Sequence, residues 1–311
     1  MQDQFPVLPF RTELYRPEEL FDGLRADDPA SYASTLDFRA YRSMSLPRSR
    51  EVGMLRALHD ECIFDEGRRF IDGHQVVAVM GGHALARTDP AYRQVAELSR
   101  AIARRGFLLL SGGGPGAMEA THLGAMLAPA GDLALDEALG ALAEVPDFPE
   151  TKGIVAPGGG IDPAKLAALH AWSAPAFRLL DQVPPEGRGA SMSVPTWFYG
   201  HEPPTPFATH IAKLFSNPLR EDGLLAAAVD GVIYGPGASG TVQEVFQDAS
   251  QNAYRTVLDR FSPMVLLDVD GFWSRQVPVL PVLRALFGDE DFERYVLTTD
   301  DPDEIVAFLC G

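Results

Sequence analysis

Lysine is scarce in this chain: Lys152, Lys165 and Lys213 are the three in 311 residues. None of them lies in the two glycine-rich turns at residues 111–116 and 235–240. A P-loop needs Gly-Lys-Ser/Thr at such a turn, so that type of phosphate site is excluded. The same scarcity argues against a cofactor held as a Schiff base, although three lysines do not exclude one.

Cysteine and long apolar runs are also rare. Cys62 and Cys310 lie near opposite ends of the chain, with neither metal-ligand spacing nor a redox pair. We therefore expect unpaired thiols in a reducing compartment. No apolar run approaches the roughly 20 residues that span a bilayer, and the N-terminus lacks a basic segment followed by an apolar one. These features predict a cytoplasmic protein with no membrane partner.

Positive charge is in short supply as well. The formal net charge is −17, which argues against a nucleic-acid backbone as the main partner. A local cluster of arginines around one phosphate remains compatible with that charge. The hydrophobic content of 46% is enough to bury a sizeable core, and predicts one large α/β domain with an appendage.

Glycine, by contrast, is concentrated in two turns. Residues 111–116 follow the apolar run 107–110, and residues 235–240 follow the apolar run 231–234; each turn precedes a helical pattern. A helix that begins directly after a buried strand presents free N–H groups and the positive end of its dipole, which suits a phosphate. The expected ligand contacts are Gly82, Gly113, Gly114, Gly116, Met118, Glu119, Gly237, Ser239, Gly240 and Thr241.

Strands and helices alternate along most of the chain. Strands are predicted at 75–80, 107–110, 231–234 and 263–267, and helices at 48–69, 91–105, 117–127, 162–180, 220–229, 241–254 and 303–309. A further helix is predicted to start at 271–273, and a candidate strand occupies 153–156. This order predicts a doubly wound, mainly parallel Rossmann-like sheet with helices on both faces.

Three regions are expected. Residues 1–72 form a partly helical N-terminal extension, and residues 73–311 form the nucleotide-binding domain. Within that domain, residues 128–219 are rich in Pro, Gly and acidic side chains and predict an insertion. We expect the insertion to cover the carboxyl edge of the sheet, where ligands bind in such folds.

The two turns resemble the paired motifs of the LOG ("lonely guy") family, which includes bacterial nucleotide 5′-monophosphate nucleosidases and has often been labelled lysine decarboxylase. Residues 113–120 are similar to its GGG-x-x-G-x-M turn and residues 237–244 to its PGG-x-GT-x-x-E turn. Arg220 matches the placement of the family's arginine. The resemblance covers about 75–127 and 217–309. Three positions depart from the family pattern: Ala238, Gln243 and Glu221.

The resemblance implies hydrolysis of the N-glycosidic bond of a nucleoside 5′-monophosphate, giving free base and ribose 5-phosphate. Glu244 and Arg220 would be the catalytic pair, and no cofactor would be required. Relatives pair through helices beside the active site, so a homo-oligomer is expected. The label of lysine decarboxylase finds no support, because no lysine lies where a cofactor aldehyde would need one.

Alternatives stay open at this point. Ala238 and the long insertion favour a non-catalytic nucleotide-binding protein of the same fold, a sensor or carrier. A dinucleotide-dependent oxidoreductase fits the first turn only loosely. Trp197, Tyr199 and His201 are either base contacts or an aromatic lid that only packs. The spacing of His201, Glu202 and His210 does not favour a metal site.

Overall fold

The computed structural model describes residues 4–198, 201–257 and 259–310. Within them the strands form one seven-stranded sheet in the order β4-β3-β2-β1-β5-β6-β7, and every neighbouring pair is parallel. The strands are β1 (Val76–Met80), β2 (Leu108–Ser111), β3 (Ser191–Ser193), β4 (His210–Ile211), β5 (Val232–Tyr234), β6 (Met264–Leu267) and β7 (Val296–Thr299). This confirms the predicted Rossmann-like class.

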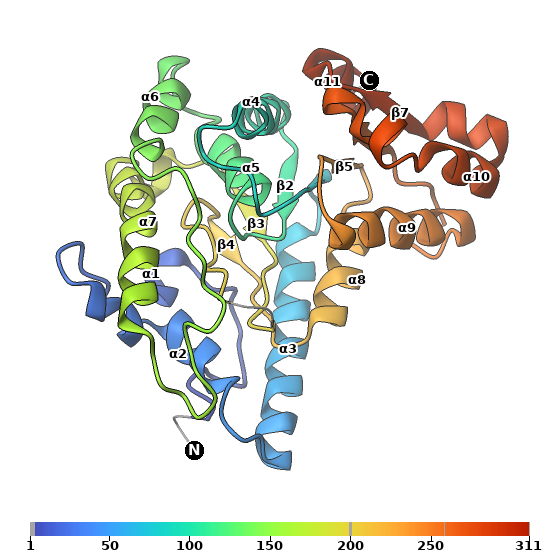
Figure 1. Cartoon of the computed structure of the whole chain (residues 1–311). Helices are drawn as coiled ribbons and strands as arrows, with labels where there is room; N and C mark the ends of the chain where they lie inside the picture. The colour runs from blue at the N-terminus through green and yellow to red at the C-terminus, as the bar shows by residue number, and fades with distance from the viewer. Residues whose placement is uncertain (1–3, 199–200, 258, 311) are drawn as a thin grey trace.

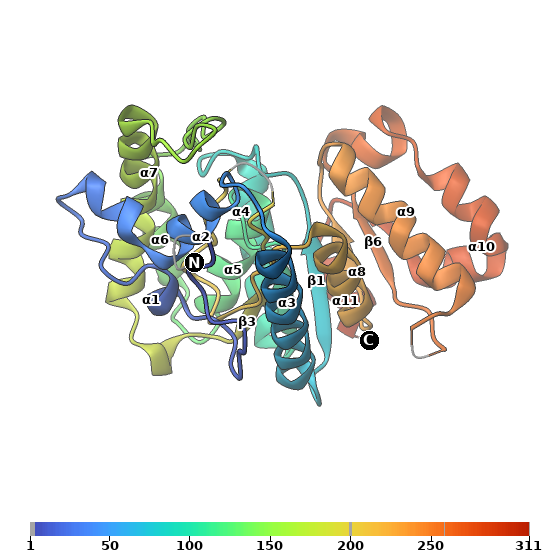
Figure 2. The ribbon, with the colours of Figure 1, turned by 90° about the horizontal axis from the view of Figure 1, so that it is seen from below.

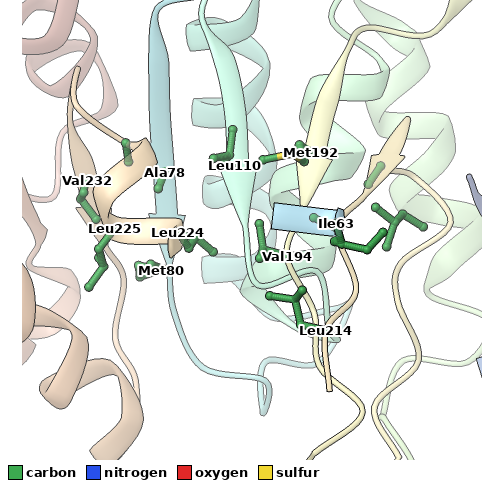
Figure 3. Close-up of a cluster of buried hydrophobic side chains, with 14 of the residues drawn as sticks. Ile63, Ala78, Met80, Leu110, Met192, Val194, Leu214, Leu224, Leu225 and Val232 are labelled. Atoms are coloured by element: carbon green, nitrogen blue, oxygen red, sulfur yellow. The ribbon is translucent and has the colours of Figure 1, made fainter. Parts of the chain in front are cut away.

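Both faces of the sheet are buried, which explains the continuous apolar sequence of its central strand. Side chains of β1 alternate between two cores: Ala78 and Met80 belong to one, and Val77 and Val79 to the other. Figure 3 shows the first core, where Ala78 and Met80 lie beside Leu224 and Leu225.

Two sets of helices cover the faces. The core that contains Ala78 takes buried side chains from α3 (Arg50–Ile71), α8 (Asn217–Ala227), α9 (Ser239–Tyr254) and α10 (Leu280–Tyr295). The opposite core takes them from α4 (Pro90–Arg104), α5 (Ala117–Met126), α6 (Leu133–Leu142) and α11 (Pro302–Cys310). Helix α7 (Pro163–Gln182) contributes to both. The helices α9 and α10 lie at the opposite end of the molecule from α1 (Pro17–Leu20) and α2 (Leu36–Ser43) (Figures 1 and 2).

The N-terminal extension packs into the same core as the sheet. Its last helix, α3, covers the sheet directly, and the α1, η1 (Pro29–Ser34) and α2 segment packs against the edge at β4. The backbone of Tyr15 exchanges two hydrogen bonds with Ile211, at 3.0 and 2.9 Å. Residues 4–72 are therefore continuous with the domain in packing.

The region predicted as an insertion contributes two strands to the sheet, β3 and β4. Neither was predicted, because three and two residues of mixed polarity carry no periodic signal. The strand expected at 153–156 is instead a single bridge between Val155 and Ile161. A 3-10 turn, η2 (Pro185–Gly187), leads into β3.

The C-terminal part differs from prediction in a similar way. The helix expected from 271 onward is two short irregular turns, η3 (Val269–Gly271) and η4 (Phe272–Gln276). Helix α10 and strand β7 follow and were not predicted. Across the part of the chain that the structure describes, no helix is long and apolar enough to span a membrane.

Strand β1 is the topological switch point of the sheet. The chain leaves it toward β2 on one side, and β5 lies on the other side. In doubly wound sheets the ligand crevice lies outside the carboxyl ends of the strands at such a point. The two glycine turns follow β2 and β5, so the topology places them on either side of β1.

The contact between α4 and α5 generates the first prediction. A Cβ at Gly124 in α5 would collide with the carbonyl oxygen of Ala96 in α4 and lie 2.9 Å from the amide nitrogen of Arg100. We expect Gly124→Ala to lower the free energy of unfolding by about 1–3 kcal/mol in urea titrations, because overpacking exceeds the gain in helix propensity.

Gly140 in α6 is the matched control. A Cβ there meets nothing within 4 Å. We expect Gly140→Ala to raise the free energy of unfolding by about 0.5–1 kcal/mol. The same sign for both variants would contradict the packing described for α4 and α5.

Candidate functional site

The carboxyl end of β1 ties the two glycine turns together. The N–H of Gly82 donates to the carbonyl of Pro236 in the second turn, at 3.3 Å. The carbonyl of Gly82 accepts from the N–H of Ala117 at the end of the first turn, at 3.2 Å. Gly82 was expected to contact ligand. The structure places its backbone as the link between two candidate binding turns.

The first turn needs glycine for its backbone conformation. Gly113 and Gly116 have φ of 74° and 70°, in the region that side chains disfavour. A Cβ on Gly116 would also lie 2.6 Å from the carbonyl oxygen of Gly82. Gly116 is the N-cap of α5, so this turn delivers the start of a helix to the sheet edge.

The second turn tolerates its departure from the family motif. Ala238 is the N-cap of α9, with φ −91° and ψ −164°, an ordinary extended conformation for any residue. Its side chain is exposed, as are Ser239 and Gly240 after it. Thr241 is buried and packs on the Cα of Gly237, where a Cβ would collide with it. Alanine at position 238 therefore costs no backbone strain.

Arg220 and Glu244 form a largely buried ion pair beside these turns. Arg220 Nη1 donates to Glu244 Oε1 at 3.1 Å, and the two side chains are 12% and 11% exposed. Arg220 Nε also donates to the carbonyl of Val194, just past β3, at 3.1 Å. The residues predicted to act together, 24 positions apart, are thus brought into contact by α8 and α9.

The environment of Glu244 has two opposing effects on its acidity. Burial raises the pKa of the Glu244 carboxyl, and the hydrogen-bonded guanidinium of Arg220 lowers that pKa. The net direction is upward. A buried carboxylate whose proton affinity is raised is suited to accept a proton from water.

The first turn also makes room for the arginine. The second guanidinium nitrogen of Arg220 lies over Gly112, where a Cβ would collide with it. The Met118 thioether lies over both Gly112 and Gly114; a Cβ on Gly114 would meet Met118 Cε at 2.9 Å. Gly112 and Gly114 therefore allow side chains from α8 and α5 to approach the turn closely.

Glu119 was expected to contact ligand, and the structure places it elsewhere. Its carboxylate is fully buried and accepts two bonds from Arg87, at 2.7 and 2.9 Å, and one from Tyr92 at 2.9 Å. Its acceptors are engaged inside the α4–α5 core. The one-residue step from Met118 rotates the side chain by about 100° around the helix axis, away from the turn. Glu119 is not carried into the proposed ligand contacts.

The expected base contacts also differ from the structure. Trp197 is 1% exposed, and its indole N–H donates to Asp37 at 2.8 Å. His201 is 1% exposed and lies 3.3 Å from the Tyr32 hydroxyl. Burial lowers the pKa of His201 to about 3, so it is neutral at pH 7. Both side chains pack against the N-terminal extension. Tyr199 lies outside the described residues.

Two side chains of the insertion, Lys213 and Glu202, lie at or near the site although the glycine motifs did not point to them. The Lys213 ammonium is fully buried and donates to Asp37 at 2.6 Å. Glu202 lies at the first turn: a Cβ on Gly114 would be 3.1 Å from Glu202 Oε2. The signal for Glu202 was an acid in a long insertion at a ligand-bearing edge. The described residues contain no group of three or more His, Cys, Asp or Glu side chains that could hold a metal ion.

A comparison with known protein families finds a match for the part of the chain that contains the first glycine turn. Residues 74–131, from β1 through the first turn and α5, match the model of the SLOG cluster4 family. The match supports the LOG-type assignment that the two glycine turns suggested.

A solved structure and the curated proteins complete the comparison. The X-ray structure of TM1055, a structural genomics target, is similar at 17% sequence identity with a TM-score of 0.42. The alignment covers 76% of this chain and 98% of that one. No curated protein matches.

The buried Arg87–Glu119 pair generates the second prediction. Removing the cation leaves a carboxylate buried without its partner, so Arg87→Leu should lower the free energy of unfolding by about 3–5 kcal/mol in urea titrations. Arg178→Leu removes an exposed pair with Glu144, 52% and 61% exposed, and should change that free energy by about 0–1 kcal/mol. Equal effects of the two variants would contradict the assigned burial.

Proposed function

We propose that this protein hydrolyses the N-glycosidic bond of a nucleoside 5′-monophosphate, releasing the free base and ribose 5-phosphate. The observation that carries the proposal is the largely buried Arg220–Glu244 pair beside two glycine turns at the switch point of the sheet. The SLOG match over 74–131 supports a nucleotide-related protein, and the reaction is our inference from the site.

The phosphate is assigned to the amides of the second glycine turn. Ser239 and Gly240 are exposed at the start of a 16-residue helix, α9, whose dipole favours an anion there. The Thr241 amide lies in the first turn of the same helix. Gly113, Gly114 and Gly116 belong to the first turn, on the other side of β1, and are assigned to contacts with the rest of the nucleotide. Neither turn requires a lysine, which agrees with the scarcity of that residue.

Glu244 is assigned to the reacting carbon. As the C1′–N bond breaks, positive charge develops on the ribose, and an adjacent carboxylate stabilises it. The same carboxylate can take a proton from the attacking water. Arg220 holds the carboxylate through one hydrogen bond and is itself fixed by the Val194 carbonyl. Arg220 therefore orients Glu244 and limits its movement.

The non-catalytic alternative had two grounds, Ala238 and the long insertion. Ala238 imposes no backbone strain on the second turn, so that turn keeps its conformation with alanine at this position. A requirement for no cofactor, a cytoplasmic location and homo-oligomer formation remain predictions that accompany the proposed reaction.

The experiment that tests the reaction is incubation of the purified protein with a panel of nucleoside 5′-monophosphates. We expect chromatography to show free base and ribose 5-phosphate in equal amounts from one or a few of them. Tight binding of a nucleotide with no product from any member of the panel would contradict the proposal and return the binding protein as the better account.

The third prediction concerns Glu244. Glu244→Gln keeps the side-chain volume and removes the charge, so turnover should fall at least about 100-fold, while nucleotide affinity measured by calorimetry changes by less than about 5-fold. Glu137→Gln, on the exposed face of α6, is the control, and its turnover and nucleotide affinity should equal those of the wild type. Turnover by Glu244→Gln equal to that of the wild type would refute the assigned mechanism.

A further inference from the structure

Glu202 brings a second carboxyl group to the candidate site. It comes from the region between β3 and β4, far in sequence from Arg220 and Glu244, and lies over the first glycine turn beside Gly114. Its Oε1 is 3.9 Å from Nδ1 of His83, which follows β1. The Glu202 side chain is 32% exposed, so it is partly shielded and still reachable from solvent.

The surroundings of Glu202 differ from those of Glu244. Glu244 receives a direct hydrogen bond from Arg220, which favours its ionised form. Glu202 instead lies beside the half-exposed His83 ring, and no guanidinium lies within ion-pair distance of it among the described residues. The two carboxyl groups therefore lie on the same edge of the sheet with different electrostatic support.

Burial raises the pKa of the Glu202 carboxyl. Three groups lower that pKa: His83 after β1, Arg220 on α8 and Lys213 after β4. The net direction is upward, so Glu202 holds its proton to a higher pH than a solvent-exposed glutamate does. The pKa of Glu244 is raised as well, so the feature that separates the two carboxyl groups is the direct hydrogen bond from Arg220 to Glu244.

We propose that Glu202 is the general acid of the reaction, delivering a proton to the departing base. This inference rests on the proposed function. Glu202 comes from a segment outside the glycine motifs and lies beside Gly114 of the first glycine turn, which follows β2. The α9 turn, to which we assign the phosphate, lies on the other side of β1. Glu244 acts on the ribose and Glu202 acts on the leaving group.

The C1′–N bond breaks and its electron pair stays on the base nitrogen, while the Glu202 carboxyl proton passes to the base. Water forms the new C1′–O bond and gives one proton to the Glu244 carboxylate. The products are the neutral base and ribose 5-phosphate. Exchange with solvent returns the proton to Glu202 and removes it from Glu244.

A substrate that needs no acid distinguishes this role from a structural one. Ribose 5-phosphate with a p-nitrophenoxy group at C1′ is such a substrate, because its leaving group, p-nitrophenolate, is stable as an anion. Glu202→Gln should lower kcat on the preferred nucleoside monophosphate by about 10²–10⁴-fold and change kcat on the p-nitrophenyl substrate by less than about 5-fold. Glu244→Gln should lose activity on both substrates.

The pH profile gives an independent readout. Wild-type kcat on the nucleotide should fall on the alkaline side as Glu202 loses its proton, and that limb should be absent in Glu202→Gln. Glu202→Asp keeps an ionisable group and should restore part of the activity together with the limb. Glu186→Gln, an exposed acid of η2, serves as the surface control.

The outcomes separate this inference from the function on which it rests. Suppose that the wild type cleaves the nucleotide. If the kcat of Glu202→Gln equals that of the wild type, or falls by the same factor on both substrates, the role of Glu202 is overturned and the proposed function stands. If the wild type cleaves neither substrate, the proposed function fails and the role of Glu202 fails with it.

Discussion

The site depends on the backbone of Gly82. Its N–H and its carbonyl bond to the second and first glycine turns respectively, so the end of one strand fixes the distance between two helix N-termini. The parallel sheet makes this possible, because the carboxyl ends of β2, β1 and β5 all meet at one edge. Every later feature of the site, from the Arg220 position to the Glu202 carboxyl, is placed relative to those two turns.

Within that frame the Arg220–Glu244 pair is a costly arrangement. Burying two charges removes their hydration, and a buried pair contributes little net stability compared with apolar side chains of similar volume. The protein nevertheless places the pair at the sheet edge and supports it with the Val194 carbonyl and the bare Cα of Gly112. A charged pair at that position is easier to explain by chemistry than by stability. The Arg87–Glu119 pair shows the contrast: it is enclosed within the α4–α5 core and serves packing.

Much of the fold could be predicted from the sequence. The central strands have uninterrupted apolar sequences, their helices have capping residues such as Asp89 and Asp162, and the glycine turns mark where strand becomes helix. Strands β3 and β4 could not be predicted, because their few residues are partly polar and are held by neighbouring strands more than by their own propensity. The same holds for β7, an edge strand with two threonines.

The site divides in the same way. Arg220 and Glu244 could be predicted because a resemblance fixes their positions relative to the turns. For Trp197 and His201 the sequence left two alternatives, because an aromatic, polar segment looks similar whether it faces a ligand or packs against another segment. The deciding factor was the buried Asp37 of the N-terminal extension, which accepts bonds from Trp197 and Lys213. Glu202 was missed as a site residue for the converse reason, since only the tertiary fold brings it to Gly114.

The most direct test of the central claim is a crystal structure of the Glu244→Gln variant with a nucleoside 5′-monophosphate bound. We expect the phosphate on the amides of Ser239, Gly240 and Thr241, and C1′ of the ribose within about 4 Å of the side chain at position 244. A nucleotide bound elsewhere, or bound with its ribose away from residue 244, would contradict the assignment of this edge as the reaction site.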